Sequence, residues 1–186
     1  FYAWGEPKMV VLMVLVTLAA SHHLLPYGGD AGGKLLALPK GIVTFVGIIA
    51  CIAFLVEGAI MDWGGVFLTT VRHFDMALAG TGFTVFSAAM LTMRLLGDWT
   101  VQKLGQERVV IGGSLLAVAG FLLIIFAPTV VLLYLGFFFI GVGCANVVPV
   151  FFSLLGKQHV MPISLAVPAV STLGYLGILM GPAAIG

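Results

Sequence analysis

Long apolar runs separated by short polar or glycine-rich segments dominate this chain. A helix needs about 20 residues, each rising about 1.5 Å, to cross the roughly 30 Å apolar core of a bilayer. Five runs come close to this length or exceed it, and we expect a transmembrane helix at each of 42–68, 80–97, 109–127, 130–155 and 163–186. Because only Pro128 and Thr129 separate the third run from the fourth, those two helices must run antiparallel.

A sixth apolar run begins at Met9 and is shorter. It has two interpretations: a further span that begins near Trp4, or the core of a signal peptide with Lys8 before it and small residues after it. We favour the span, because the residues before Lys8 include a glutamate and a proline and make a poor leader. The segment 21–41 that follows is rich in Gly and Pro, as is typical of a flexible linker.

The composition supports a membrane protein with several spans. The 186 residues are 61% hydrophobic and only 8% charged, whereas soluble domains carry about 25% charged residues. The net charge of +1 provides no basic surface for nucleic acid. Cys51 and Cys144 lie in apolar runs and resemble small buried residues, and the four histidines lack partners at metal-ligand spacing. We therefore expect no metal, no cofactor and no nucleic-acid partner.

Lysine and arginine in the connecting segments predict the orientation. If the linker 21–41 is cytoplasmic, five basic residues lie inside and two lie outside. The inside residues would be Lys34, Lys40, Lys103, Arg108 and Lys157, and the outside residues Lys8 and Arg72. This bias predicts a cytoplasmic linker.

Glu57 and Asp62 interrupt the first long run, "FLVEGAIMDWGGVFL". A charged side chain at mid-membrane costs about 3 kcal/mol on insertion scales. Counted from Ile42, Glu57 lies about 22 Å along the helix and Asp62 about 30 Å, close to the opposite interface. Glu57 is therefore the costly carboxylate, and Asp62, where water can reach it, is a further candidate for the same pathway. We interpret Glu57 as a proton or substrate site that faces water, with a structural hydrogen bond to a neighbouring helix as the alternative.

Arg94 is the nearest candidate partner in the sequence, but the same arithmetic argues against it. A helix that begins at Gly80 places Arg94 about 13 Å from Glu57 in depth, whereas an ion pair needs a separation of about 4 Å. Asp98 follows Arg94 by four residues on the same helical face. We therefore expect Arg94 to pair with Asp98 and Glu57 to stay unpaired within this chain.

Asn146 is the other deep polar group. Pro149, three residues later, frees a backbone carbonyl and can kink the helix. An asparagine in lipid usually bonds across a helix interface, and a polar contact with a solute is the other interpretation. Tyr175, near Ser171 and Thr172, is a weaker candidate for the same pathway.

Two stretches resemble motifs of the major facilitator superfamily. The stretch 94–113, "RLLGDWTVQKLGQERVVIGG", is similar to the family's loop motif through Arg94, Gly97, Asp98, Lys103, Gly105 and Arg108, although Glu107 departs from its basic run. The stretch 177–186, "GILMGPAAIG", is similar to the family's Gly-Pro helix motif through Gly177, Gly181, Pro182 and Gly186. Over 42–186 the pattern looks most like the YbjJ-like, fucose-permease-like transporters of the bacterial inner membrane.

The resemblance implies an all-α membrane fold with two six-helix bundles. Residues 1–20 would be the last helix of the first bundle, 21–41 the cytoplasmic linker, and 42–186 the second bundle without its final helix. We accordingly read the sequence as a fragment whose partner is the missing N-terminal bundle. The family's internal repeat would make 42–68 and 130–155 line the cavity, which places Glu57 and Asn146 on a pathway.

We therefore expect a multi-pass protein of the bacterial inner membrane that transports a small solute by alternating access, coupled to protons. Arg94, Asp98 and Arg108 would latch the cytoplasmic side in one state. Multidrug-type efflux is an alternative within transport, and a channel or a non-transporting scaffold is an alternative outside it. An enzyme is disfavoured, because no His, Asp and Glu cluster has the spacing of a catalytic site.

Overall fold

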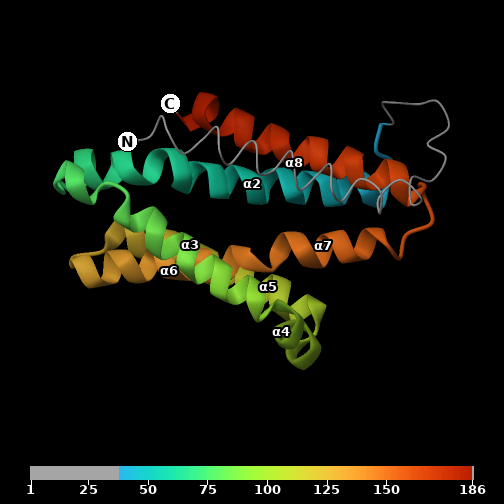
Figure 1. The fold of residues 1–186 in the computed structure, drawn as a ribbon, viewed down its shortest axis with the longest axis horizontal. Coiled ribbons are helices and arrows are strands. Elements are labelled where there is room, and N and C mark those ends of the chain that lie inside the picture. Colours follow the sequence, from blue (N-terminus) through green and yellow to red (C-terminus); the bar gives the residue numbers. More distant parts are fainter. Residues whose placement is uncertain (1–37, 186) are drawn as a thin grey trace, which may run out of the picture. The chain divides into compact units, whose positions relative to one another are not determined.

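The computed structural model describes residues 38–185, and these residues form helices joined by short connections (Figure 1). Contacts divide the chain into the units Phe1–Leu36 and Ala37–Gly186, and the described residues belong to the second. The helices are α2 (Ile42–Val66), the π-helical turn η3 (Phe67–Val71), the 3₁₀ turn η4 (Met76–Leu78), α3 (Thr81–Leu95), α4 (Gly97–Leu104), α5 (Gln106–Phe126), α6 (Val130–Ala145), α7 (Val147–Leu155) and α8 (Ile163–Ile185). The helix expected at 1–20 lies outside the described residues, as does the linker apart from 38–41.

All five long runs form helices that are long and apolar enough to cross a membrane. They extend over Ile42–Val71, Met76–Leu95, Gln106–Phe126, Val130–Leu155 and Ile163–Gly181. The first is longer than predicted, because η3 continues α2 to Val71 and gives a span of 30 residues. The prediction of an all-α membrane protein is confirmed.

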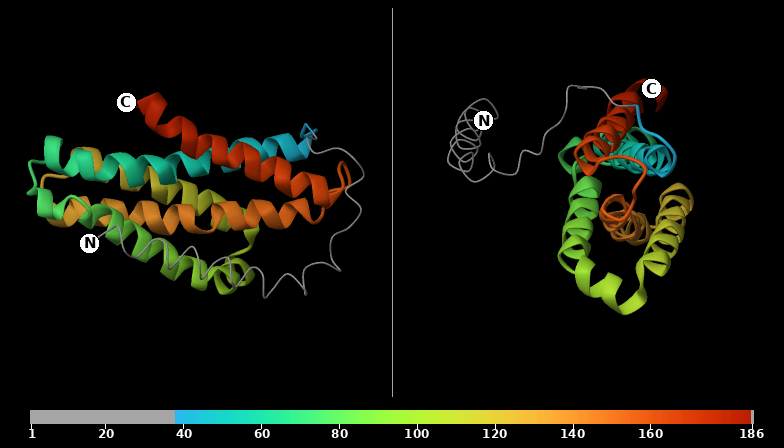
Figure 2. Two further views of the ribbon diagram at one scale, coloured as in Figure 1. Left: turned by 45° about the horizontal axis from the view of Figure 1, so that its top comes forward. Right: turned by 90° about the vertical axis from the view of Figure 1, so that its right-hand side faces the viewer.

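Consecutive spans alternate in direction, and the packing forms two groups. α2 lies along α8, while α6 and α7 are flanked by α3 on one side and α5 on the other (Figure 2). We call the end with Gly41, α4 and the connection 156–162 the basic end, and the end with the connections 72–80 and 127–129 the far end. Within the described residues, the connections and helix termini at the basic end contain Lys40, Lys103, Arg108 and Lys157, and those at the far end contain Arg72.

Arg72 ties the two helical hairpins together at the far end. Its guanidinium donates hydrogen bonds to the carbonyls of Ile124, Ile125 and Ala127, at 2.5, 3.1 and 3.0 Å. These carbonyls end α5 and have no donor of their own within that helix. A cation at this position also interacts favourably with the negative end of the helix dipole. Arg72 therefore fixes the α2–α3 turn against the end of α5.

Glycine pairs bring α5 and α6 into backbone contact. A Cβ on Gly113 would lie 2.6 Å from the carbonyl oxygen of Gly143, and a Cβ on Gly120 would lie 2.7 Å from that of Gly136. Small residues let membrane helices approach closely, and packing then drives their association in place of the hydrophobic effect. Gly112, the neighbour of Gly113, has open space where a side chain would be.

This difference between neighbouring glycines predicts opposite outcomes for the same substitution. Gly113→Ala should destabilise the protein by about 1–3 kcal/mol, because a backbone carbonyl cannot move aside cheaply. Gly112→Ala should leave stability unchanged or raise it slightly, since alanine favours a helix more than glycine does. Thermal unfolding in detergent checks both variants, and an equal loss in both would contradict the packing described here.

Candidate functional site

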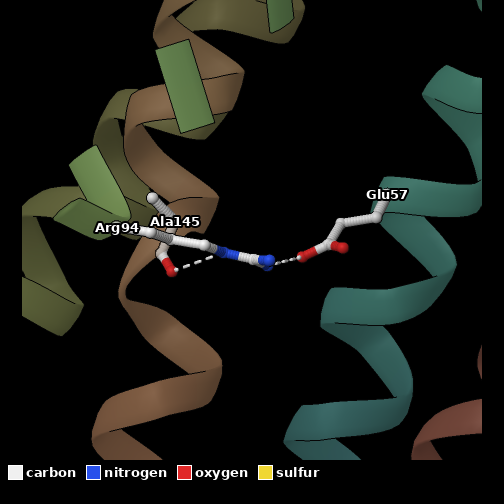
Figure 3. A network of polar contacts seen from close by, with 3 residues as sticks. All are labelled: Glu57, Arg94 and Ala145. Carbon is white, nitrogen blue, oxygen red and sulfur yellow. Dashed lines mark hydrogen bonds and ion pairs between the residues drawn. The ribbon is translucent and has the colours of Figure 1, made fainter. Parts of the chain in front are cut away.

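An ion pair joins Glu57 of α2 and Arg94 of α3 (Figure 3). Arg94 Nη2 donates to Glu57 Oε1 at 3.1 Å, and the two side chains are 43% and 21% exposed, respectively. Arg94 Nε also donates to the carbonyl oxygen of Ala145 at 3.4 Å. One guanidinium thus links α2, α3 and the end of α6.

The expectation that Arg94 would pair with Asp98 and leave Glu57 alone is wrong. The depth estimate placed the bilayer edges at Ile42 and Gly80, whereas both helices are longer than that. Counted from the far-end turn that joins them, Glu57 lies about 21 Å from Val71 and Arg94 about 27 Å from Met76. α3 also runs obliquely to α2, so the difference in depth between Glu57 and Arg94 is smaller than these lengths along the helices suggest (Figure 1). The long side chain of Arg94 spans the remaining difference in depth and reaches Glu57.

The break between α6 and α7 provides the second acceptor for Arg94. The helix is interrupted at Asn146, with φ −103° and ψ −3°. Pro149 has no N–H group, so the carbonyl of Ala145, four residues earlier, loses its usual helical donor. This is the carbonyl that accepts from Arg94. The prediction that Pro149 frees a carbonyl is confirmed, and the structure adds the donor that takes its place.

Asn146 bonds across the interface between α3 and the α6–α7 break. It is 5% exposed, and its Nδ2 donates to the carbonyl oxygen of Met93 at 3.4 Å. A Cβ on Gly97 would lie 2.6 Å from Asn146 Oδ1, so the glycine makes room for the amide. Arg94 and Asn146 therefore make reciprocal bonds to the backbone of each other's helix. A contact between Asn146 and a solute stays a prediction.

Two cavities flank Arg94. The central cavity, of about 250 Å³, lies between α2, α3 and α8 and contains Glu57, Ser87 and Arg94 in its lining. The basic-end cavity, of about 260 Å³, lies between α3, α4, the start of α5 and α7. Its polar lining comprises Arg94, Asp98, Gln102, Gln106, Asn146 and Ser153. Glu57 and Asn146, which were expected to share one pathway, thus lie on opposite sides of Arg94.

The other residues predicted for the pathway lie elsewhere. Asp62 is exposed and lines a third cavity toward the far end, of about 380 Å³. Tyr175 of α8 is 61% exposed and its ring lies 5.9 Å from that of Phe54. The structure therefore brings neither of them to the Glu57–Arg94 pair.

The loop-motif residues surround α4 at the basic end. Gly105 follows α4 with φ +84°, a left-handed conformation that favours glycine. Lys103 Nζ lies over the ring of Trp99, at 4.9 Å from its centroid. Asp98 and Arg108 are exposed, and within residues 38–185 neither forms an ion pair.

The Gly-Pro motif lies in α8. Its residues Gly177 and Gly181 face α2. A side chain on Gly177 would meet the backbone carbonyl of Cys51, so this glycine allows close approach of the two helices. Gly181 is also buried, while Pro182 lies in the last turns of α8. Gly186 lies outside the described residues.

Sequence reasoning missed the small polar side chains of these cavities. Ser87 precedes Arg94 by seven residues, two helical turns, and so lies on the same face. Gln102 and Gln106 are four residues apart, although Gly105 ends one helix between them. The seven-residue spacing between Ser87 and Arg94 could have identified Ser87 as a cavity residue. No such spacing identifies Ser153, whose Oγ accepts a hydrogen bond from Gln106 Nε2 at 3.1 Å. No group of His, Cys, Asp or Glu side chains that could hold a metal lies among the described residues.

The fit of Gly97 against Asn146 predicts a non-additive pair of substitutions. Gly97→Ala should destabilise the protein by about 1–3 kcal/mol, because its Cβ would press on the Asn146 amide. Asn146→Ala removes that amide, so the double variant should lose less stability than the sum of the two single variants. Thermal unfolding of the wild type, the two single variants and the double variant measures this coupling. Additive losses of stability would show that the two residues do not act on each other.

Comparisons with known proteins identify the chain's relatives. It is 44% identical over 178 residues to an uncharacterized MFS-type transporter of Yersinia pestis, covering 95% of this chain and 46% of that relative. It is 37% identical over 157 residues to an uncharacterized transporter of Sinorhizobium fredii, covering 84% of this chain and 42% of that relative. It is also 29% identical over 173 residues to the membrane protein MosC of Rhizobium meliloti, covering 93% and 40%.

Other comparisons add no match. No protein-family model matches the chain. No solved structure matches it either. The chain spans less than half the length of each of these curated relatives. The chain has five helices long and apolar enough to cross a membrane, and it is similar to a little under half of an MFS-type transporter.

Proposed function

We propose that this chain is the half of a secondary active transporter that contains the coupling site: Glu57 releases Arg94 when it takes up a proton from water, and Arg94 then binds an anionic group of the solute. The observation that carries the proposal is the Glu57–Arg94 ion pair beside a cavity of about 250 Å³. Intramembrane ionisable residues usually mark proton or substrate pathways. The transported species is a small solute, and its passage follows alternating access.

The Glu57–Arg94 ion pair favours exchange of one binding partner for another: a proton at Glu57 and an anionic solute group at Arg94. The two side chains are 43% and 21% exposed, so removing one partner leaves the other without its ion-pair contact at a cost of about 1 kcal/mol. A proton on Glu57 therefore releases Arg94 to seek another anion, and an anionic solute group at Arg94 favours a proton on Glu57. Each event promotes the other. This reciprocity is what coupling of a solute to protons requires.

The orientation follows from the distribution of basic residues. Apart from Arg94, which is paired with Glu57, four of the five lysines and arginines of the described part lie at the basic end. Cytoplasmic loops carry the excess of Lys and Arg, so the basic end and the linker 21–41 face the cytoplasm. The relatives come from bacteria, which favours the inner membrane. Within residues 38–185 Asp98 and Arg108 form no ion pair, so at this end they can latch onto another bundle, whereas Arg94 is already bound to Glu57.

The division of the chain is part of the same proposal. Residues 1–20 form the last helix of a first bundle, 21–41 the linker, and 42–186 most of a second bundle. The relatives' greater length supports a further bundle outside this sequence. Efflux in place of uptake uses the same machinery. A channel is disfavoured, because rings of like polar groups line channels, whereas here opposite charges pair.

Proton coupling at Glu57 predicts a specific loss. In vesicles with the intact protein and a trapped pH-sensitive dye, a panel of sugars and small organic acids should include at least one solute that evokes proton movement. Glu57→Gln keeps the side chain's shape but cannot ionise, so the evoked proton movement should fall to background.

Glu107→Gln is the matched control, because Glu107 is an exposed glutamate in the first turn of α5. This variant should behave as the wild type. Undiminished proton movement in Glu57→Gln would remove the coupling role. Transport of a solute without any proton movement in the wild type would leave a transporter but refute coupling.

A further inference from the structure

The lining of the central cavity is apolar apart from three side chains. Glu57 of α2 and Ser87 and Arg94 of α3 are its polar members. The rest of the lining consists of glycine, methionine, phenylalanine, leucine and isoleucine, namely Gly58, Met61, Phe83, Phe86, Met90, Leu91 and Ile178. This chain therefore supplies the site with one carboxyl group, one guanidinium and one hydroxyl group, set in apolar surface.

The charge of the central cavity depends on whether Glu57 carries a proton. When Glu57 is ionised, its carboxylate lies 3.1 Å from the guanidinium of Arg94 and the two charges cancel (Figure 3). When Glu57 is protonated, Arg94 gives the cavity a single positive charge. Because arginine does not lose its proton in proteins, no state of this pair is negative overall. The pair can therefore attract one negative charge, whereas it never attracts a cation.

Within the described residues, the helices around Glu57 bring no further charged group to the central cavity. The other ionisable side chains of the described parts of α2, α3, α6 and α8 are Cys51, Asp62, Tyr134, Cys144 and Tyr175. Thiols and phenols are largely uncharged near neutral pH, and Asp62 lines the cavity toward the far end instead. A second negative charge on a solute would therefore find no cation to compensate it in this part of the protein, which is unfavourable beside apolar walls.

The apolar walls also disfavour a solute with many hydroxyl groups. A hydroxyl group taken out of water without a hydrogen-bond partner is unfavourable, and Ser87 is the one hydroxyl group in the described lining beside the ion pair. Phe86 is buried, and the ring of Phe83 lies 6.2 Å from it, centroid to centroid. Met61 and Met90 add flexible thioether side chains, which adapt to the shape of apolar groups. These walls suit a hydrocarbon ring or a branched chain.

We infer that the solute is a small organic acid with one carboxylate and an apolar body. Its carboxylate binds Arg94, whose planar guanidinium matches carboxylate geometry, while Glu57 holds the proton. Its body lies against Phe83 and Phe86. The volume of about 250 Å³ is below the roughly 300–1,000 Å³ of sites for drug-sized ligands, so the body is small. The inference rests on the proposed function, from which it takes the release of Arg94 by a protonated Glu57.

Binding of matched probes to the full-length protein in detergent tests this class of solute. Benzoate, phenylacetate and isovalerate carry one charge on an apolar body. Gluconate carries the same charge on a hydroxylated body, phthalate carries two charges, and benzylammonium carries the opposite charge. Equilibrium dialysis of the radiolabelled probes measures each Kd. At least one of the first three should bind tenfold or more tightly than the last three, because each of these leaves hydroxyl groups or a charge without a partner.

Variants of the ion pair test the role of charge, with the tightest of the three acids as the probe. Arg94→Gln should abolish binding, whereas Glu57→Gln should tighten it about fivefold at pH 8, since no carboxylate then competes for Arg94. Binding to the wild type should weaken as the pH rises, because a proton accompanies the anion, and Glu57→Gln should lose this dependence. Lys157→Gln is the matched control, because Lys157 is an exposed cation outside the cavity.

A variant of the apolar wall tests where the body of the acid lies. Phe83→Ala should weaken binding of the acid about threefold to tenfold, the range expected for a lost aromatic contact. It should leave the Kd of acetate, which has almost no apolar body, unchanged. Phe138→Ala is the matched control, because Phe138 is an exposed phenylalanine outside the cavity.

Thermal unfolding identifies variants that do not fold. If Arg94→Gln is one of them, the double variant Glu57→Gln/Arg94→Gln replaces it, and this neutral pair should bind none of the acids. Failure of all three acids to bind, equal binding of gluconate, phthalate or benzylammonium, or binding that survives the loss of Arg94 would overturn the inference.

The proposed function succeeds or fails separately. If gluconate or a sugar evokes proton movement that Glu57→Gln abolishes, coupling stands and the inferred class of solute is wrong. If an apolar acid binds through Arg94 but evokes no proton movement in vesicles, the class of solute stands and coupling is refuted.

Discussion

The pairing of one carboxylate with one guanidinium inside an apolar bundle constrains the rest of this structure. A charge in an apolar surrounding is stabilised by a partner or a polar cavity, and Glu57 and Arg94 have both. Their contact fixes α2 against α3 at a point far from the turn that joins them. It also leaves the site electrically neutral, so the helices can remain in the membrane without a bound ion.

The pair is supported by a helix break that supplies polar backbone where side chains are scarce. Pro149 removes one donor from the α6–α7 helix, and the freed carbonyl of Ala145 holds the guanidinium. Asn146 returns a hydrogen bond to the backbone of α3 at Met93. Irregular backbone is acceptable at membrane depth only where it is buried in protein or lines a cavity. Here it does both, and it orients Arg94 toward Glu57.

The sequence alone predicted the spans, their antiparallel order and the family, because apolar runs and loop motifs are local signals. It also identified Glu57 and Asn146 as unusual. It failed on the partner of Glu57, since depth depends on where helices end and how they tilt, and neither is a local property. η3 lengthens the first span to Val71, and η4 starts the second at Met76. These additions shift both helices relative to any count from apolar boundaries.

The glycine pairs between α5 and α6 have a mechanical consequence. Where carbonyl oxygens of one helix touch the α-carbons of the other, no layer of side chains remains that could slide or repack. The two helices therefore form one rigid unit, so a displacement of the broken α6–α7 helix carries α5 with it. Most of α5 is unburied within the described residues. Any displacement of α6 therefore also displaces the apolar surface that α5 leaves uncovered.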